Sequence, residues 1–208
     1  MKQLSLGGAW TLAIPGKLES PVKAVVPGSV YADLLREGVI PDPFFGVNEE
    51  IVLPWMDHDF FYEKTFSVPA DLKNTGQILI RFEGIDTLSE ITLNDTVIGR
   101  TSDMHRTYEF DVTKLLKDED NVLSVRLFSP TLYIKEAYKE SRADGSSDAM
   151  KGFPLLRKAH CMFGWDWGPH LPDAGIWRAV YLEGIEGGRI NDVLVRQVHE
   201  ENRVRLDI

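Results

Sequence analysis

The residues that could do chemistry gather in one run, Cys161–Pro169, which reads Cys-Met-Phe-Gly-Trp-Asp-Trp-Gly-Pro. Its centre places one carboxylate, Asp166, between two indoles, Trp165 and Trp167. An indole face can cover the apolar face of a sugar ring, and a carboxylate accepts hydrogen bonds from paired hydroxyls. The run therefore predicts a carbohydrate site with these three substrate-binding residues. By itself it does not predict a complete enzyme.

Each of these side chains also has a structural interpretation. Asp166 could accept hydrogen bonds from amides of its own loop, as aspartates do in Asx turns. Trp165 and Trp167 could wedge the loop against the body of the protein, because tryptophans are mostly buried. Gly164 and Gly168 favour a turned loop, in which the carboxylate and an indole converge.

The residues that follow the run are interpreted as structural. Trp177 opens a strand within Gly-Ile-Trp-Arg, and its indole is expected to pack. Arg178 is expected to anchor an ion pair, with Asp173 as the nearest candidate partner.

No spacing in the chain predicts a metal, a cofactor or a catalytic group. His160 and His170 are ten residues apart, and a zinc site needs further ligands in convincing geometry. Cys161 has no companion pattern of a nucleophile and is expected to be a small packed residue. The pairs Glu49-Glu50 and Glu200-Glu201 are adjacent in sequence, so we expect solvated charges instead of an acid/base pair.

Composition bounds the partners. The net charge of −9 argues against nucleic acid and against an anionic membrane surface, since both need clustered Lys and Arg. The single cysteine permits no intrachain disulfide, which fits a reducing compartment. The first residues are too polar for a signal peptide, and no window approaches the ~18 apolar residues of a membrane span. A soluble, cytoplasmic protein is the expectation.

The elements that must position the run are mostly strands, because apolar residues alternate with period two between turn residues. Asn94-Asp95 predicts a tight hairpin, since both residues tolerate positive φ. Ser29 to Gly38 reads as a capped helix, Leu132 to Glu140 as a second, and Lys114 to Leu116 as a helical turn. Many short strands with little helix predict an all-β jelly roll or β-sandwich. The expected strands are 62–68, 77–83, 89–93, 96–99, 108–112 and 121–128.

The end of the chain predicts a second domain. Gly184-Ile-Glu-Gly-Gly188 looks like a junction, and two strands, 190–199 and 203–208, follow it. A lone two-stranded hairpin is marginal in water. We therefore expect a sugar-binding jelly roll over 1–186 and, over 187–208, the start of a truncated β-sandwich domain.

The segment Pro41–Gly46, with Trp55 beyond it, is aromatic and stiffened by proline. Two interpretations stay open: the segment packs locally over the sandwich, which we favour, or it faces another domain. In the second case the 208 residues alone would expose an apolar patch.

In order along the chain, eight segments resemble the N-terminal sugar-binding domain of family 2 glycoside hydrolases, in the β-mannosidase branch. The segment Ala174–Arg178 departs in having Ala174 where Ser is usual, and Phe163–Pro169 is similar to the branch's own motif. The matching segments are Val26–Val30, Ile40–Gly46, Phe61–Pro69, Phe82–Asp86, Leu93–Gly99, Phe110–Thr113, Phe163–Pro169 and Ala174–Arg178.

The resemblance implies a retaining enzyme that removes terminal, non-reducing β-mannose from oligosaccharides or glycans. Its two catalytic glutamates would lie roughly 5 Å apart. They would sit on a (β/α)₈ barrel of about 250 residues that follows an immunoglobulin-like domain. The present residues would lend a loop, with Asp166 on the terminal sugar, and would be inactive alone. Two alternatives stay open: a free-standing carbohydrate-binding module, and a family 2 enzyme for β-galactosides, β-glucuronides or glucosaminides.

Overall fold

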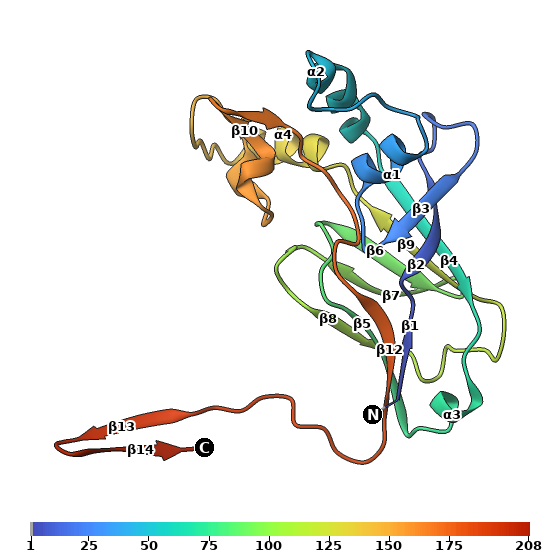
Figure 1. The fold of residues 1–208 in the computed structure, drawn as a ribbon, viewed down its shortest axis with the longest axis vertical. Helices are drawn as coiled ribbons and strands as arrows, with labels where there is room; N and C mark the ends of the chain where they lie inside the picture. The colour runs from blue at the N-terminus through green and yellow to red at the C-terminus, as the bar shows by residue number, and fades with distance from the viewer. Residues whose placement is uncertain (1) are drawn as a thin grey trace.

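Two antiparallel sheets form the body of the protein in the computed structural model, which describes residues 2–208 (Figure 1). One sheet has six strands in the order β3-β2-β4-β9-β6-β7, and the other has four in the order β1-β12-β5-β8. The six are β3 (Val22–Val26), β2 (Gly8–Ala13), β4 (Phe60–Phe66), β9 (Asn121–Leu127), β6 (Ser89–Leu93) and β7 (Thr96–Thr101). The four are β1 (Lys2–Ser5), β12 (Val180–Ile185), β5 (Gln77–Phe82) and β8 (Tyr108–Asp111). The predicted β-sandwich and its main strands are confirmed.

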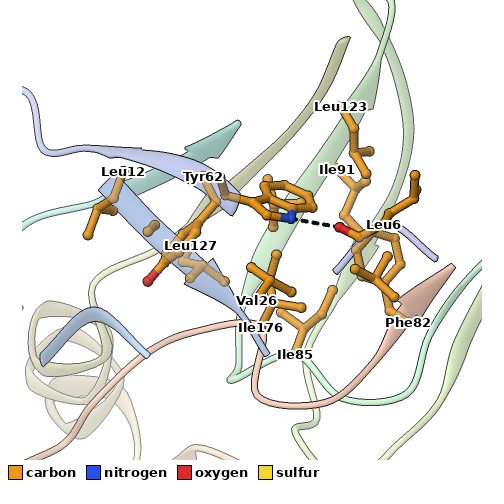
Figure 2. Close-up of a cluster of buried hydrophobic side chains, with 14 of the residues drawn as sticks. Leu6, Leu12, Val26, Tyr62, Phe82, Ile85, Ile91, Leu123, Leu127 and Ile176 are labelled. Carbon is orange, nitrogen blue, oxygen red and sulfur yellow. Dashed lines mark hydrogen bonds between the residues drawn. The ribbon is translucent and has the colours of Figure 1, made fainter. Parts of the chain in front are cut away.

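The core lies between these sheets because alternate residues of each strand point inward. In β9, for example, residues 121, 123, 125 and 127 are buried and those between them are half-buried. Figure 2 shows Tyr62 of β4 and Phe82 of β5 in this core, where the indole N–H of Trp10 donates to the Leu6 carbonyl at 2.8 Å. Burial of this continuous apolar cluster supplies the main driving force for folding.

Two local predictions are confirmed in detail. Asn94 and Asp95 have φ of 48° and 63° and join β6 to β7, as a two-residue hairpin turn requires. Helix α1 (Val30–Arg36) starts at Ser29, whose hydroxyl accepts from the Ala32 N–H. The helix is followed by its C-cap Glu37 and then by Gly38, which has the positive φ, 69°, expected of the residue after the cap.

Helices are few and short, as expected. Residues 113–115 form a turn, and the N–H groups of Leu115 and Leu116 both donate to the Val112 carbonyl at 2.9 and 3.3 Å, as the predicted single helical turn requires. The remaining helices are α2 (Asn48–Val52), α3 (Ala70–Lys73) and α4 (Pro130–Glu140), with 3₁₀ turns η1 (Leu53–Asp57), η2 (Phe153–Leu155) and η3 (His160–Met162). None of the helices in residues 2–208 is both long and apolar enough to cross a bilayer.

The last residues form a separate hairpin that extends away from the sandwich (Figure 1). Strands β13 (Arg196–Glu200) and β14 (Arg203–Asp207) pair only with each other and are almost wholly exposed. The first strand starts at Arg196 and not at residue 190 as the sequence predicts. Residues 190–195 are exposed, and they pair with no other strand in the part of the chain that the structure describes.

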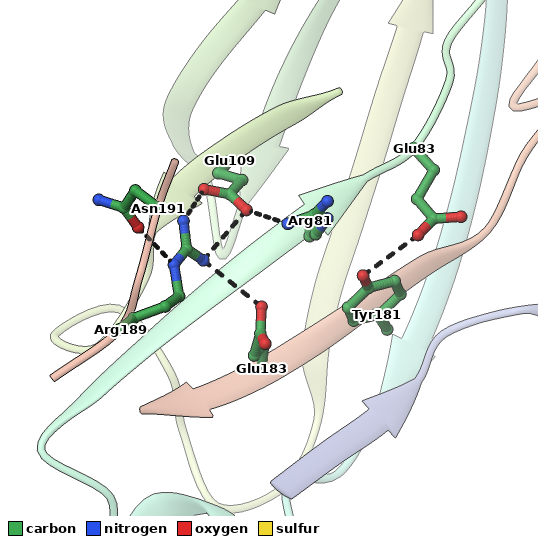
Figure 3. Close-up of polar contacts among 7 residues, drawn as sticks. All are labelled: Arg81, Glu83, Glu109, Tyr181, Glu183, Arg189 and Asn191. Atoms are coloured by element: carbon green, nitrogen blue, oxygen red, sulfur yellow. Dashed lines mark hydrogen bonds and ion pairs between the residues drawn. The ribbon is translucent and has the colours of Figure 1, made fainter. Parts of the chain in front are cut away.

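The path from the sandwich to this hairpin is fixed by an ionic cluster (Figure 3). Arg189 forms a bidentate pair with Glu109 of β8, at 3.1 and 2.6 Å, and lies 3.5 Å from Glu183 of β12. Arg81 of β5 also contacts Glu109, at 2.5 Å. Because Arg189 donates to it, the pKa of Glu109 is lowered. The segment that leaves the sandwich is therefore held at its first residues.

The proline-stiffened loop before α2 does not pack onto the sandwich through its aromatic rings. Pro43 is buried, but Phe44 and Phe45 are 79% and 75% exposed. The favoured interpretation of local packing is therefore wrong for both phenylalanines. Trp55 in η1 is half-buried, with the Lys17 ammonium 4.7 Å from its ring centre.

Candidate functional site

The Trp-Asp-Trp run forms a small β-hairpin, here called the WDW hairpin (residues 163–170). Strands β10 (Phe163–Trp165) and β11 (Gly168–His170) pair with Phe163 opposite His170 and Trp165 opposite Gly168. Asp166 and Trp167 are the two turn residues. The glycine-rich sequence thus gives the turned geometry that was predicted.

The tip of the hairpin presents all three predicted sugar-binding side chains to solvent. Trp165 is 44% exposed and Trp167 81% exposed, with ring centres 5.3 Å apart and planes inclined by 43°. Asp166 is exposed, and in residues 2–208 its carboxylate accepts no hydrogen bond from a loop amide. The interpretations of wedged indoles and of an Asx turn therefore do not describe this loop. The tip can offer an aromatic surface beside an unengaged acceptor.

A small second core supports the base of the hairpin. Phe163 packs with Ile134 of α4 and with Phe153 and Leu156 of the preceding loop, apart from the main core. The Phe153 and Phe163 ring centres are 5.9 Å apart. Gly164 has a φ of 91°, and a Cβ there would lie 2.4 Å from the His170 ring. Glycine is therefore required where the two strands meet so closely.

A buried ion pair ties this loop to the sandwich. Lys158 Nζ lies 2.5 Å from Asp86, on the loop after β5, and donates to the Asp173 carbonyl at 2.5 Å. The Lys158 side chain has no exposed surface and that of Asp86 only 4%. A buried charge without its partner is costly. The pair therefore holds the segment around Lys158 against the loop that follows β5.

A second ionic contact holds the other strand of the hairpin. The His170 N–H donates to Glu49 Oε1 at 2.7 Å, and His170 Nδ1 lies 2.7 Å from the same oxygen. His170 Nε2 lies 2.8 Å from the Asp148 carbonyl oxygen. Glu49 belongs to α2, so the aromatic loop before α2 and the WDW hairpin are neighbours at one end of the molecule (Figure 1).

Asp173 lies close to this region and carries a perturbed pKa. Burial raises the pKa of its carboxyl group to about 6, against hydrogen bonds from Ser29, Tyr31 and Ala174 that favour the charged form. Asp173 Oδ1 accepts from the backbone N–H groups of Tyr31 and Ala174 at 3.1 and 2.8 Å. These contacts join α1 to the segment between the WDW hairpin and β12.

Three sequence predictions near the hairpin are wrong. Arg178 does not pair with Asp173; its guanidinium stacks on the Trp177 ring at 4.1 Å. Cys161, in η3, is exposed and not packed. Glu49 is not a simply solvated charge, since it holds His170. Trp177 has the structural role that was predicted, since its indole N–H donates to the Met104 carbonyl at 3.1 Å.

Sequence reasoning missed the residues that position the hairpin. Lys158 and Asp86 are 72 positions apart, and Glu49 and His170 are 121 positions apart. The only signal in the sequence was that these charged residues lie in or near the segments that were singled out. Among residues 2–208 there is no group of three or more His, Cys, Asp or Glu side chains arranged for a metal ion.

The sequence matches the profile of a family described as "Glycosyl hydrolase 2 galactose-binding domain-like" over residues 10–178. Among curated relatives, β-mannosidase of Capra hircus is 32% identical in a 207-residue alignment that covers 95% of this chain and 23% of that protein. β-Mannosidase of Mus musculus is 35% identical in a 192-residue alignment that covers 86% of this chain and 21% of that protein. The chain thus spans about a quarter of these relatives' length.

Solved structures give the same picture. A β-D-mannosidase from Dictyoglomus thermophilum superposes with a TM-score of 0.90 at 39% identity, over 99% of this chain and 25% of that one. A β-glucuronidase from an uncultured Clostridium sp. gives a TM-score of 0.62 at 19% identity, over 100% of this chain and 34% of that one. At that identity the second likeness shows the fold alone.

Proposed function

The chain belongs to the glycosyl hydrolase 2 galactose-binding domain-like family, and from this premise we propose that it is the N-terminal domain of a β-mannosidase. The whole enzyme would be a retaining exo-glycosidase that hydrolyses terminal, non-reducing β-D-mannose residues of oligosaccharides or glycans. The observation that carries the proposal is the WDW hairpin, whose exposed tip combines two indoles with a free carboxylate.

In this proposal the hairpin supplies one wall of the sugar subsite. Asp166 accepts hydrogen bonds from two hydroxyls of the terminal mannose, and these bonds are strong because the acceptor is charged. Trp165 or Trp167 covers the apolar face of the ring, and the other indole packs against the neighbouring domain. A convex tip cannot enclose a sugar alone, which is why the remaining walls must come from elsewhere.

The catalytic pair would lie outside these residues. A retaining mechanism needs two carboxyl groups about 5 to 5.5 Å apart, one as nucleophile and one as acid/base. Glu49, whose carboxylate contacts the hairpin, is already paired with His170. That this chain spans about a quarter of its β-mannosidase relatives leaves room for a barrel of about 250 residues. The 208 residues alone are then expected to be inactive.

The exposed aromatic loop fits the same assembly. Phe44, Phe45 and Trp167 are each at least 75% exposed, and α2 and the hairpin adjoin through Glu49 and His170. Exposed apolar patches of this kind mark interaction sites. We assign this end of the sandwich as the face that meets the downstream barrel of the same protein.

The sandwich and the separate hairpin support a division of the chain into two domains. We propose that 1–186 form the sugar-binding jelly roll and that 187–208 begin an immunoglobulin-like β-sandwich. The lone, exposed pair β13–β14 supports this, because such a pair is marginally stable without further strands. We also propose a cytoplasmic location, which the exposed thiol of Cys161 fits.

Substrate assays test the proposal directly. The longer protein should hydrolyse an aryl β-D-mannoside in preference to the matching β-galactoside, β-glucuronide and β-glucosaminide. The 208-residue chain should show no hydrolysis, and titration with mannose should give little or no binding. Preference for another of these glycosides would mean that the enzyme acts on that sugar and not on mannose. Measurable binding of manno-oligosaccharides by the 208 residues would favour a free-standing carbohydrate-binding module.

A further inference from the structure

We propose that Glu49 and His170 form a positioning clamp, which holds the WDW hairpin in the orientation that Asp166 needs to meet a sugar. The inference rests on the proposed function and deepens it. It assigns a role to two residues that do not themselves touch the sugar.

The clamp concentrates its contacts on one carboxylate oxygen. Glu49 Oε1 accepts from the His170 backbone N–H and faces His170 Nδ1, both at 2.7 Å. The first contact fixes the strand, and the second fixes the ring. Hydrogen bonds to a charged acceptor are about twice as strong as neutral ones, so this oxygen holds β11 at its last residue.

The ring of His170 is held at both of its nitrogens. Its Nε2 lies 2.8 Å from the Asp148 carbonyl oxygen, and the ring lies close to Gly164, where a Cβ would be 2.4 Å from it. Both ring nitrogens therefore face acceptors. Both contacts are hydrogen bonds only when each nitrogen carries a proton, and the Glu49 carboxylate then supplies the opposite charge.

Most of the other supports act on the first strand of the hairpin or on the chain beyond its second strand, where Leu171 packs against the main core. Phe163 of β10 packs in the small core, and Lys158 anchors the chain before it. Strand β11 returns after the turn and is tied by its pairing with β10 and by the clamp. Asp166 lies between these two strands, so loss of the clamp frees β11 from α2 and leaves that strand to its pairing with β10 and to the contact between His170 and the Asp148 carbonyl.

A bland alternative is that the pair is an ordinary surface ion pair. Its side chains are 31% and 34% exposed, and exposed pairs contribute little to stability. The two interpretations differ in outcome. A surface pair predicts almost no effect on either stability or kinetics, whereas a clamp predicts a local effect on residues 163–170 with a kinetic consequence.

The test uses four variants. Glu49→Ala removes the acceptor, and Glu49→Gln keeps an acceptor oxygen without the charge. Glu50→Ala is the matched control, because Glu50 is the exposed neighbour on the same helix and makes no side-chain contact in the described residues. Asp166→Ala serves as the reference for loss of the sugar contact.

Two measurements separate the outcomes. In the 208-residue chain, amide hydrogen exchange of residues 163–170 should accelerate in Glu49→Ala on the order of ten- to a hundredfold, with an unchanged unfolding midpoint. In the longer protein, kcat/KM for an aryl β-D-mannoside should fall on the order of ten- to a hundredfold. Glu49→Gln should lie between Glu49→Ala and wild type, and Glu50→Ala should match wild type.

The results that overturn the inference are distinct from those that overturn the proposed function. If Asp166→Ala lowers kcat/KM but Glu49→Ala does not, the clamp is refuted and the proposed function stands. If exchange of residues 163–170 is unchanged in Glu49→Ala, the clamp is likewise refuted. If Asp166→Ala has wild-type kinetics, Asp166 does not belong to the site and the positioning role fails with it, whereas the proposed function itself fails only if the longer protein does not prefer the β-D-mannoside.

Discussion

Replacing Lys158 by Met should be among the most damaging single changes in this sandwich. The Lys158 side chain is fully buried, 2.5 Å from an Asp86 carboxylate that is itself 4% exposed. Without the ammonium, Asp86 keeps the hydroxyl of Thr87 as a side-chain partner, and its charge stays out of water. Removing one partner of a buried pair costs about 3–5 kcal/mol because the other charge is left uncompensated.

That cost is large against the stability of a domain, which is typically about 5–15 kcal/mol. For a chain of this size, ~1 kcal/mol shifts the melting temperature by about 2–4 °C, so Lys158→Met should lower it by roughly 6–20 °C. The free energy of unfolding is measured by urea titration followed by circular dichroism. Lys151→Met, at an exposed lysine of the same loop, is the control and should stay within about 0.5 kcal/mol of wild type.

A double variant makes the reasoning sharper. Asp86→Asn combined with Lys158→Met removes both charges, so it should be less destabilised than Lys158→Met alone. Two results would contradict this expectation. The free energy of unfolding of Lys158→Met could lie within about 1 kcal/mol of wild type, or the destabilisation of the double variant could equal the sum of the two single variants.

Three further changes test other parts of the structure. Gly164→Ala forces a side chain into a φ of 91° and against the His170 ring, so it should loosen residues 163–170 and cost about 1–3 kcal/mol by urea titration. The pKa of Asp173 is raised to about 6, so folded protein binds a proton that unfolded chain releases above about 4. Stability should therefore fall as pH rises from about 4 to 6, and Asp173→Asn should remove that part of the slope in urea titrations across pH; a parallel slope in the variant would contradict it. Arg189→Met frees the exit segment from Glu109, so thermolysin should cleave 190–195 several-fold faster with little change in unfolding midpoint; equal cleavage rates would argue against the anchor.

Short-range features of the fold were predictable from the sequence. Alternating strands, the Asn94-Asp95 turn and the capped helix after Ser29 depend on neighbouring residues, and all appear as expected. The hairpin was also within reach, because Gly164 and Gly168 bracket Trp-Asp-Trp.

Contacts between distant residues were not predictable. Glu49 meets His170, and Lys158 meets Asp86, only because the sandwich brings their loops together. A periodic pattern carries no information about such pairs, so Glu49 read as a solvated charge. The exposure of side chains was not predictable for the same reason. Hydrophobic character predicted burial for Phe44, whereas its surroundings leave it 79% exposed.

The central claim is that Asp166 belongs to a mannose subsite. Its most direct test is kcat/KM of the longer protein for a terminal β-D-mannoside, in wild type, Asp166→Ala and Glu119→Ala, an exposed carboxylate on the loop before β9. Asp166→Ala should lower kcat/KM on the order of ten- to thousandfold with an unchanged unfolding midpoint, and Glu119→Ala should not lower it. Wild-type kcat/KM in Asp166→Ala would contradict the claim and remove Asp166 from the site.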